Sequence, residues 1–416
     1  MLLKASGSER YYWIAGPCRL AVKNGSIDIN GAVLGSGEEI VIHRNRSYTM
    51  ILSGDAEVEV SVEGGGECCE ADENTVASLI EWREVANRVI EECASKGGCR
   101  VVVIGDVDSG KTTMTTLLAN LALRKGLPTR LVDADVGQSS IGMPGFISAT
   151  SYKKQEVWPR RMVADEMFYV GSITPAGFQD RVIHGVSKLA GSSAGMVIID
   201  TDGWVEGSEA VDYKMRLVCA ASPSHIILVT NNDRVKTIYE KIMGSVGAKI
   251  LVLTPPPKRR VRSRMDRMLL RGDKVYLEEM SRTLVLPLSK HFVVGSIKLG
   301  LGEELDAAEK KRISEKLRTR VLYAEDQGDR IAVVVKGVPR GRIRGVRVYS
   351  VDTMRGMLSC IVGEGGKHLA PAIIHGFEEE RRAVVVRTFV SEGVKGLLTG
   401  YIVCEGNTIR QVRGFA

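Results

Sequence analysis

The stretch that decides the fold is Arg100–Thr116, which reads RVVVIGDVDSGKTTMTT. Its apolar run Val101–Ile104 predicts a strand buried on both faces, and a helical pattern of apolar residues follows Thr116. The turn between them fits the spacing G-x-x-x-x-G-K-[ST] at every fixed position, namely Gly105, Gly110, Lys111 and Thr112. A strand, a glycine-rich turn and a helix in this order are typical of a phosphate-binding P-loop.

This turn has the residue types that the phosphates of a nucleotide require. Glycines let the backbone curl so that successive N–H groups point at phosphate oxygens, and the following helix N-terminus adds partial positive charge. We expect Lys111 to reach the β- and γ-phosphates and the Thr112 hydroxyl to bind Mg²⁺. The expected nucleotide-binding residues are Gly105, Asp106, Val107, Asp108, Ser109, Gly110, Lys111, Thr112 and Thr113. The alternative is a strand-to-helix turn without a ligand.

Composition indicates an ordinary globular protein. The 416 residues allow two to four domains, 44% of them are hydrophobic and 26% are charged. The formal net charge of +7 is a mild bias, compatible with an acidic partner. No apolar run reaches the roughly 18 residues of a membrane span, and the first residues lack the apolar region of a signal peptide.

The eight cysteines include no CxxC pair, and no histidine pair has zinc-finger spacing. Because the sequence carries no recognisable export signal, we expect reduced thiols rather than a disulfide framework or a zinc site.

Hydrophobic patterning divides the chain into three parts. Residues 1–75 contain short apolar segments separated by Asn-Gly and Gly-rich turns, which predicts a small antiparallel β domain in which Arg44 and Arg46 flank a solvated turn. Residues 76–300 begin with a helical pattern and then alternate strands with helices, which predicts a doubly wound, mostly parallel sheet of the P-loop NTPase type. Residues 301–416 predict a C-terminal β-rich α+β domain. The expected fold class is therefore α/β with two flanking β-containing domains.

Several carboxylates follow predicted strands of the central sheet. Asp135 comes just after the strand Thr129–Asp133, where these folds place an acid that positions a metal or a reacting hydroxyl. Asp133 is the second candidate, and the alternative role of Asp135 is to cap a turn. Asp200 and Asp202 follow a later apolar strand and compete with Asp135 for the metal.

Trp204 lies in a polar loop after the same later strand. We weigh two interpretations: a partly buried packing residue, or a platform on which a nucleic-acid base stacks.

A basic run follows the last strand of the predicted sheet. After three prolines, residues 258–264 read KRRVRSR, with five basic residues among seven. If this run is helical, Arg260 and Arg264 lie one turn apart and face the same phosphoryl group as a lid; the alternative is a solvated helix. A second basic stretch, Lys336–Arg347, holds five basic residues and no acid, which is compatible with nucleic acid, a protein partner or solvent.

Four motifs in this order resemble one family. They are GDVDSGKTT at residues 105–113, DADVGQ at 133–138, TDGW at 201–204 and RVRSR at 260–264. Together they are similar to the polynucleotide 5′-hydroxyl kinases, the P-loop RNA kinases of RNA processing, across about residues 76–300. The unadorned chain looks most like the archaeal members.

The resemblance implies roles for these positions. Lys111 holds the γ-phosphate, Thr112 binds Mg²⁺, and Asp135 orients or deprotonates the 5′-hydroxyl and supports the metal. Arg260 and Arg264 close as a catalytic lid. The implied RNA-binding residues are Gln138, Thr201, Gly203 and Trp204.

The resemblance also implies the reaction. The γ-phosphate of ATP is transferred to the 5′-OH end of RNA, with DNA as a second acceptor, and proteins of RNA processing are the expected partners. The expected location is the cytoplasm for an archaeal-like protein and the nucleus for a eukaryotic one.

Three other functions remain open at this point. A GTPase or ATPase switch is one, although the stretch nearest the guanine signature N-K-x-D, Thr230–Asp233, lacks its lysine. An ATP-binding scaffold of an RNA-processing complex is the second. A small-molecule kinase is the third.

Overall fold

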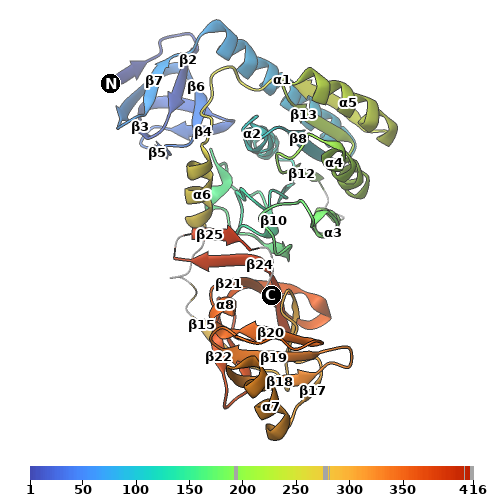
Figure 1. Cartoon of the computed structure of the whole chain (residues 1–416). Coiled ribbons are helices and arrows are strands. Elements are labelled where there is room, and N and C mark those ends of the chain that lie inside the picture. Colours follow the sequence, from blue (N-terminus) through green and yellow to red (C-terminus); the bar gives the residue numbers. More distant parts are fainter. Residues whose placement is uncertain (192–194, 275–279, 281, 407, 413–416) are drawn as a thin grey trace. The chain divides into compact units, whose positions relative to one another are not determined.

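The computed structural model describes the whole chain except residues 192–194, 275–279, 281, 407 and 413–416. Contacts divide the chain into two compact units, each of which is described by itself (Figure 1). The first contains Met1–Gly142, Ile147–Glu166 and Pro175–Arg267. The second contains Met143–Phe146, Met167–Thr174 and Met268–Ala416.

The first unit begins with a seven-stranded antiparallel sheet, as the alternating pattern predicts. Five of its strands lie in the order β4-β3-β6-β2-β7. The other two pair elsewhere, β1 with β6 and β5 with β3. Its buried side chains come from alternate positions, such as Val58 and Val60 on β6. The strands are β1 (Leu2–Lys4), β2 (Arg10–Ala15), β3 (Cys18–Ile29), β4 (Ala32–Gly35), β5 (Glu39–Ile42), β6 (Ser47–Val62) and β7 (Glu67–Glu70).

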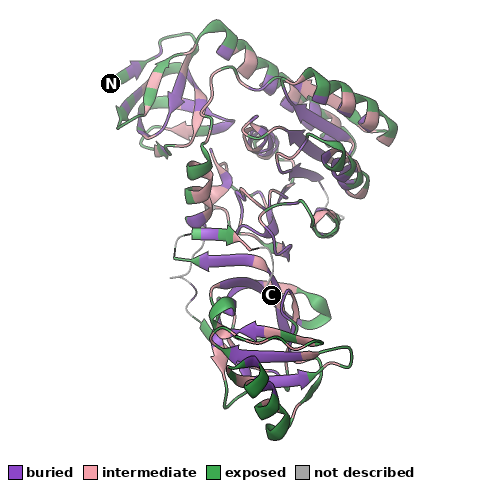
Figure 2. Ribbon diagram, in the orientation of Figure 1, coloured by how far each residue is buried: buried purple, intermediate pink, exposed green. Residues whose placement is uncertain are grey.

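A second sheet forms the centre of the first unit. Its order is β11-β10-β9-β12-β8-β13-β14, and the five strands from β9 to β14 in this order are parallel, with β10 antiparallel to β9. The strands β12 and β13 are buried throughout, and β8 is buried from Val101 to its end (Figure 2). The strands are β8 (Gly98–Gly105), β9 (Thr129–Asp133), β10 (Phe146–Ser151), β11 (Glu166–Tyr169), β12 (Gly195–Asp200), β13 (His225–Val229) and β14 (Lys249–Leu253).

Helices cover both faces of this sheet, which confirms the doubly wound prediction. On one face, α1 and α2 pack against alternate residues of the strands, such as Val101 and Val103 of β8. The buried sides of α3 and α4 lie outside that cluster and pack together elsewhere on the sheet. The helices are α1 (Glu73–Ser95), α2 (Lys111–Arg124), α3 (Gln179–Ala190), α4 (Ser208–Ala221), α5 (Asp233–Met243) and α6 (Arg264–Gly272), with 3-10 helices η1 (Pro159–Arg161) and η2 (Gly244–Val246).

The second unit contains two packed sheets. One follows the order β15-β23-β22-β21-β24-β16 with β25 on β24, and the other follows β17-β18-β19-β20. A shared core joins them, and α7 covers the outer face of the four-stranded sheet. The elements are β15 (Arg282–Pro287), β16 (Phe292–Gly295), β17 (Glu303–Glu304), α7 (Ala307–Leu317), β18 (Arg320–Asp326), β19 (Ile331–Lys336), β20 (Val346–Ser350), α8 (Val351–Met354), β21 (Met357–Val362), η3 (Glu364–Gly366), β22 (His368–Glu378), β23 (Ala383–Thr388), β24 (Gly396–Glu405) and β25 (Thr408–Gln411).

The limits of these units differ from the boundary expected at residue 300. β15 pairs with β23 and β16 with β24, so residues 282–295 complete a sheet of the second unit. The sequence pattern carried no information about the distant partners of these residues. The division into three domains stays a prediction.

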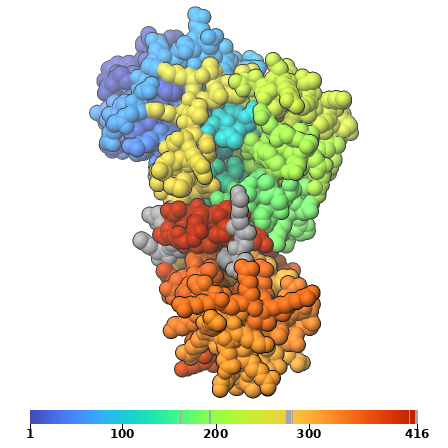
Figure 3. All heavy atoms as spheres, viewed as in Figure 1, coloured from blue at the N-terminus to red at the C-terminus, as the bar shows by residue number. Residues whose placement is uncertain are grey.

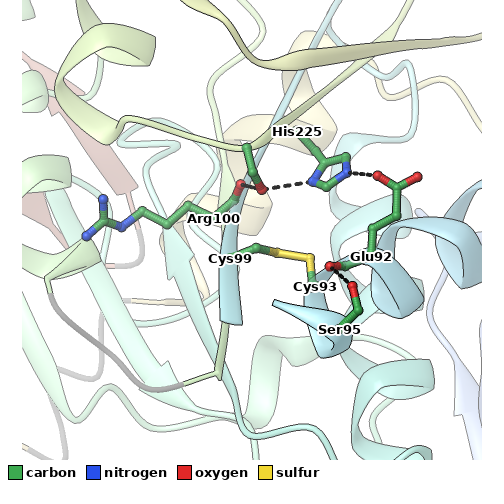
Figure 4. Close-up of a disulfide and its surroundings, with 7 residues drawn as sticks. Glu92, Cys93, Ser95, Cys99, Arg100 and His225 are labelled. Carbon is green, nitrogen blue, oxygen red and sulfur yellow. Dashed lines mark hydrogen bonds and ion pairs between the residues drawn. A yellow bond between two sulfur atoms is a disulfide. The ribbon is translucent and has the colours of Figure 1, made fainter. Parts of the chain in front are cut away.

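The cysteines include one disulfide, which corrects the expectation of reduced thiols throughout. Cys93, at the end of α1, is bonded to Cys99, at the start of β8 (Figure 4). The turn Lys96–Gly98 brings the two Cα atoms within 5.1 Å of each other. His225 lies beside the pair, and its Nε2 is 2.9 Å from the Glu92 carboxylate.

Among the helices of the described part of the chain, none is long and apolar enough to cross a membrane.

Candidate active site

The P-loop connects β8 to α2, and close packing holds its glycines in place. Gly110 has a φ of 105°, which favours glycine, and a Cβ there would lie 2.8 Å from the Trp82 ring of α1. A Cβ on Gly105 would lie 2.2 Å from the carbonyl oxygen of Val229. Both positions therefore need glycine for packing as well as for a phosphate ligand.

Lys111 is the first residue of α2, and its side chain is buried beside the loop. Its Nζ donates a hydrogen bond to the carbonyl oxygen of Asp106 (2.7 Å), so the lysine arches back over the P-loop. Burial lowers the pKa of Lys111, while the carboxylates of Asp200 and Asp135 favour its charged form. The two aspartates therefore lie close enough to Lys111 to share an electrostatic environment with it.

Thr112 contacts Asp200, which follows directly from the strand order. Its hydroxyl donates a hydrogen bond to Oδ2 of Asp200 (2.7 Å). The strand β12, which ends in Asp200, lies between β9 and β8 and is the neighbour of the P-loop strand. The expectation that Asp135 shares a metal with Thr112 assumed that β9 was this neighbour. In the structure Asp200 takes that position.

The Asp200 carboxyl group is unusual in being buried and incompletely hydrogen-bonded. Its Oδ1 has no hydrogen-bond partner among the described residues. Burial raises the pKa of Asp200 from its ordinary value of 3.8 to about 6, against the opposing effects of Thr112 and Lys111. A buried, unpaired carboxylate oxygen costs free energy, so its retention points to a ligand.

These oxygens fit Mg²⁺. This ion prefers hard oxygen ligands and is usually held by one or two protein oxygens together with substrate phosphates and water. The Thr112 hydroxyl and the Asp200 carboxylate supply such oxygens side by side at the end of the P-loop. The unpartnered Oδ1 of Asp200 supplies another.

Asp135 caps a turn and also keeps one oxygen without a partner. Its Oδ1 accepts hydrogen bonds from the backbone N–H groups of Gly137 (3.0 Å) and Gln138 (2.9 Å), as the capping alternative predicts. No hydrogen bond reaches Oδ2 from the described residues. Burial raises the pKa of Asp135, and the neighbouring Asp202 adds to this effect.

Asp133 has a structural role. Its Oδ2 accepts hydrogen bonds from the backbone N–H groups of Ser140 (2.5 Å) and Ile141 (2.8 Å) and from the Ser139 hydroxyl. Burial raises the pKa of Asp133 to about 7.

The side-chain amide of Gln138, in the loop after β9, donates hydrogen bonds to the carbonyl oxygens of Gly137 and Arg267.

The TDGW segment divides into buried and accessible parts. The Thr201 hydroxyl donates to the carbonyl oxygen of Val103 (2.8 Å) and is fully buried, so it belongs to the sheet. A Cβ on Gly203 would lie 2.7 Å from the Val107 side chain, which places this glycine directly against the P-loop. Trp204 is half-buried and stacks on the Tyr213 ring, with 5.9 Å between ring centroids.

Asp202 is fully engaged by partners that the sequence did not reveal. Its Oδ2 accepts a hydrogen bond from the Tyr213 hydroxyl (2.7 Å) and forms an ion pair with Lys214 (2.9 Å). Lys214 has no exposed side-chain surface. An ion pair removed from water is strongly disrupted when one partner is lost, so this pair fixes the loop that carries Trp204. Asp202 is thus a supporting residue.

The basic run after β14 is irregular and not helical until α6 begins at Arg264. Arg260 and Arg264 are therefore not one helical turn apart, which corrects that expectation. The Arg260 backbone N–H donates to the Ser47 hydroxyl (2.9 Å), and its side chain contacts the Gly65 carbonyl and, at 3.8 Å, Glu67. Arg264 is exposed. The three prolines before the run and the contacts of Arg260 with the N-terminal sheet keep this segment out of the helix.

Two other arginines of this run, Arg259 and Arg262, and Arg267 of α6 reach the P-loop. Asp108, in the loop, accepts a hydrogen bond from Nε of Arg262 (2.6 Å) and pairs with Arg267 at 3.3 Å. Nε of Arg259 donates to the Asp108 carbonyl oxygen (3.1 Å). The sequence alone did not distinguish Arg259 and Arg262 from Arg260 and Arg264, because five of the seven residues in the run are basic.

Arg46 was expected in solvent, yet the structure buries it near the charges of Asp108 and Arg262. Its guanidinium lies 3.9 Å from the centroid of the Trp158 ring, and its buried Nε has no partner among the described residues. Burial lowers the pKa of Arg46 to about 10, and the charges acting on it include Asp108 and Arg262. No feature of the turn sequence indicated this, because the contact depends on the packing of the N-terminal sheet on the P-loop region.

Comparisons with known proteins agree with this geometry. Residues 105–277 match the family model described as mRNA cleavage and polyadenylation factor CLP1 P-loop. A polyribonucleotide 5′-hydroxyl-kinase of Pyrococcus furiosus is 29% identical over 319 residues, which are 75% of this chain and 88% of the relative. One of Methanocaldococcus jannaschii is 26% identical over 306 residues, 70% and 82% of the two chains.

A solved structure supports the fold. The wild-type Clp1p in complex with Pcf11p superposes with a TM-score of 0.66 over 96% of this chain and 97% of that chain, at 12% identity. At this identity the likeness shows the fold alone. Residues 105–277 of this chain are thus similar to the CLP1 P-loop family, and about three quarters of the chain is similar to archaeal polyribonucleotide 5′-hydroxyl-kinases.

Proposed function

We propose that this chain is an ATP-dependent polynucleotide 5′-hydroxyl kinase that transfers the γ-phosphate of ATP to the 5′-OH end of RNA, with DNA as a second acceptor. The observation that carries the proposal is the grouping of side chains around Lys111. Thr112 and Asp200 are hydrogen-bonded to each other, and the carboxylates of Asp200 and Asp135 both act electrostatically on Lys111. The relatives named polyribonucleotide 5′-hydroxyl-kinase support the reaction.

The P-loop positions the phosphates of ATP. Backbone N–H groups of residues 105–113 and the N-terminus of α2 bind phosphate oxygens, and Lys111 neutralises charge between the β- and γ-phosphates. The buried Ser109 hydroxyl has no partner among the described residues, which suits a loop that receives polar ligand atoms. Thr112 and Asp200 would hold Mg²⁺, which would supply further positive charge to the phosphates.

Asp135 serves the acceptor end of the reaction. Its free Oδ2 is available to the 5′-hydroxyl, while the backbone N–H groups of Gly137 and Gln138 hold its other oxygen in place. A pKa raised by burial makes this carboxylate a better proton acceptor than an exposed aspartate. We assign to Asp135 the orientation of the 5′-hydroxyl and the acceptance of its proton, rather than metal binding.

Arginines of the 258–264 run and of α6 stabilise the transferred phosphoryl group. The expected pair was Arg260 and Arg264; the contacts with Asp108 favour Arg262 and Arg267 as the residues that lie over the P-loop. Asp108 orients them, and phosphate oxygens of ATP offer them the same bidentate geometry. Arg46 adds positive charge to the same region.

The nucleotide at the 5′ end is held by Trp204, whose half-buried ring offers its accessible surface for base stacking. Gly203 lets this loop approach the P-loop, and Gln138 lies in the loop of Asp135. Thr201 contributes through the backbone position of the segment, since its side chain is buried. Stacking and phosphate contacts carry little sequence information, so we expect weak sequence preference.

We further infer an RNA-processing setting with protein partners, which the family description supports. The cytoplasm is the proposed location in a cell without a nucleus, and the nucleus is the proposed location in a eukaryotic cell.

The test is transfer of labelled γ-phosphate from ATP to a short 5′-OH RNA, with the matching 5′-phosphate RNA as control. Label on the 5′-OH RNA alone is expected. Asp135→Asn should abolish transfer and retain ATP binding, whereas Asp212→Asn, on the exposed side of α4, should leave both unchanged. Release of free phosphate with no label on either RNA would make the chain an NTPase and sink the proposal.

A further inference from the structure

One strongly basic segment of this chain lies in the second unit. Residues 305–347 contain twelve Lys and Arg against six Asp and Glu, a net charge of +6, while the whole chain carries +7. The run at residues 258–271 carries the same net charge of +6, with seven Lys and Arg against one Asp, and the rest of the chain is acidic overall. It contains α7, the strands β18, β19 and β20, and the loop 337–345.

Packing turns the charges of α7 outward. Ile313 and Leu317 are buried against the four-stranded sheet. The exposed residues of the helix and its C-terminal cap include Lys311, Arg312, Lys316 and Arg318, with Glu309 and Glu315 among them. Orange atoms, from this part of the sequence, lie on the visible face of the second unit (Figure 3).

The loop 337–345 is fixed against the end of this helix. The backbone N–H groups of Arg340 and Gly341 donate to the carbonyl oxygen of Leu317 (3.0 and 3.2 Å). A Cβ on Gly341 would lie 2.1 Å from the carbonyl oxygen of Lys316, so only glycine allows this approach. Ile343 packs into the core beneath α7. The three exposed arginines of the loop are thereby held beside the cations of the helix.

Seven cations form what we call the α7 basic surface, and among the described residues none of the seven has a carboxylate within 4.0 Å. They are Lys311, Arg312, Lys316, Arg318, Arg340, Arg342 and Arg344. Other cations of the segment differ: Arg320 pairs with Glu379 and Arg330 with Asp329. The surface thus holds charges that internal ion pairs do not neutralise.

We propose that the α7 basic surface binds the phosphate backbone of RNA, as a contact separate from the residues that hold the reacting 5′ end. The proposal rests on the proposed function, which makes RNA the substrate. Arginines bind phosphates through paired N–H groups, and neutralised phosphates release counterions. The aromatic residue of the segment, Tyr323, is buried, so no base stacks here and the contact is independent of RNA sequence.

The test replaces the three loop arginines with glutamine, Arg340→Gln, Arg342→Gln and Arg344→Gln together, in the full chain. The probe is a short single-stranded RNA with a 5′-phosphate and a 3′ fluorophore, and anisotropy gives Kd at several salt concentrations. If each arginine meets one phosphate, the slope of log Kd against log salt should fall by about 2, and Kd at ~0.1 M salt should rise about a hundredfold.

A charge-matched control uses the N-terminal sheet. Lys4→Gln, Arg19→Gln and Lys23→Gln remove the same charge from exposed residues that pair with Glu57, Glu39 and Glu59. This control should leave the slope and Kd near those of the unmodified chain. Equal losses in both triple variants, or no loss in either, would overturn the proposal. Thermal denaturation shows whether the glutamine variant is still folded. If it is unfolded, the lysine variant Arg340→Lys, Arg342→Lys, Arg344→Lys decides: binding by this variant supports the proposal, and loss of binding overturns it.

The failure of this proposal and the failure of the proposed function can be told apart. The 5′-phosphate RNA is not an acceptor, so its binding does not depend on catalysis. A reduced slope in a chain that never labels 5′-OH RNA would sink the kinase and keep the surface. Normal labelling with an unchanged slope would sink the surface and keep the kinase.

Discussion

Replacement of Asp200 by asparagine should change stability and catalysis in opposite directions. The Asn side-chain oxygen can still accept the hydrogen bond of the Thr112 hydroxyl, which is 2.7 Å from Oδ2 in the structure. The variant removes the charge that burial disfavours. It also removes a carboxylate oxygen that we assign to Mg²⁺, so phosphoryl transfer should fall by about a hundredfold or more.

The size of the stability effect follows from the pKa of the buried carboxyl group. Burial raises the pKa of Asp200 from 3.8 to about 6, so ionisation costs more in the folded than in the unfolded chain. Below pH 3.8 the group is protonated in both states, and between pH 3.8 and 6 the unfolded state loses its proton first. From about pH 4 to about pH 7 the unfolding free energy of the unmodified chain should therefore fall by roughly 2.5 kcal/mol relative to Asp200→Asn.

Urea unfolding of both proteins across this pH range, with a chelator present, measures the difference directly. The absolute difference at one pH also contains the cost of the new amide group, about 1–3 kcal/mol if it stays unpaired, but this cost does not titrate. Asp212→Asn, which changes an exposed carboxylate of α4, is the matched control for the substitution itself. If the stability difference for Asp200→Asn is flat with pH, or if the variant loses stability relative to the unmodified chain as pH rises, the reasoning is refuted.

Three other predictions concern separate parts of the site and fold. Arg262→Ala should lower kcat by about a hundredfold because it removes charge from the moving phosphoryl group, while Arg260→Ala should change kcat less than threefold or so; equal losses in steady-state kinetics would contradict the assignment. Trp204→Ala should raise KM for RNA by about tenfold, from the loss of one stacked base, with KM for ATP unchanged; an unchanged RNA KM would return the ring to a packing role. Cys93→Ser with Cys99→Ser should lower the free energy of unfolding by about 2 kcal/mol under oxidising conditions, from the loop entropy of a six-residue separation. A reductant should remove that difference, and a difference that survives it would have another cause.

Much of the fold was readable because its signals are local. The spacing of Gly105, Gly110 and Lys111 is a property of eight consecutive residues, and the helix after it follows from apolar periodicity. Strand–helix alternation predicted a parallel sheet, since parallel neighbours need a crossover between them. The structure confirms these elements and the N-terminal antiparallel sheet.

The sequence did not predict contacts between residues that are far apart in the chain. The sequence offered Asp135 and Asp200 as acids after strands, and only the strand order decided which of them meets Thr112. The arginines of the basic run were equivalent in sequence, because each is defined by what it contacts across the fold. Arg46 was assigned to solvent for the same reason.

The sequence by itself determined that this chain has a phosphate-binding loop between a buried strand and a helix, and which family it resembles. Those properties depend on residue types at short spacing, where backbone geometry and periodicity leave few alternatives. Only the tertiary structure decided that Asp200 meets Thr112, that Asp108 meets Arg262, and that Cys93 reaches Cys99. These contacts join residues on different elements, and the packing of sheets and helices, rather than any local pattern, sets which side chains meet.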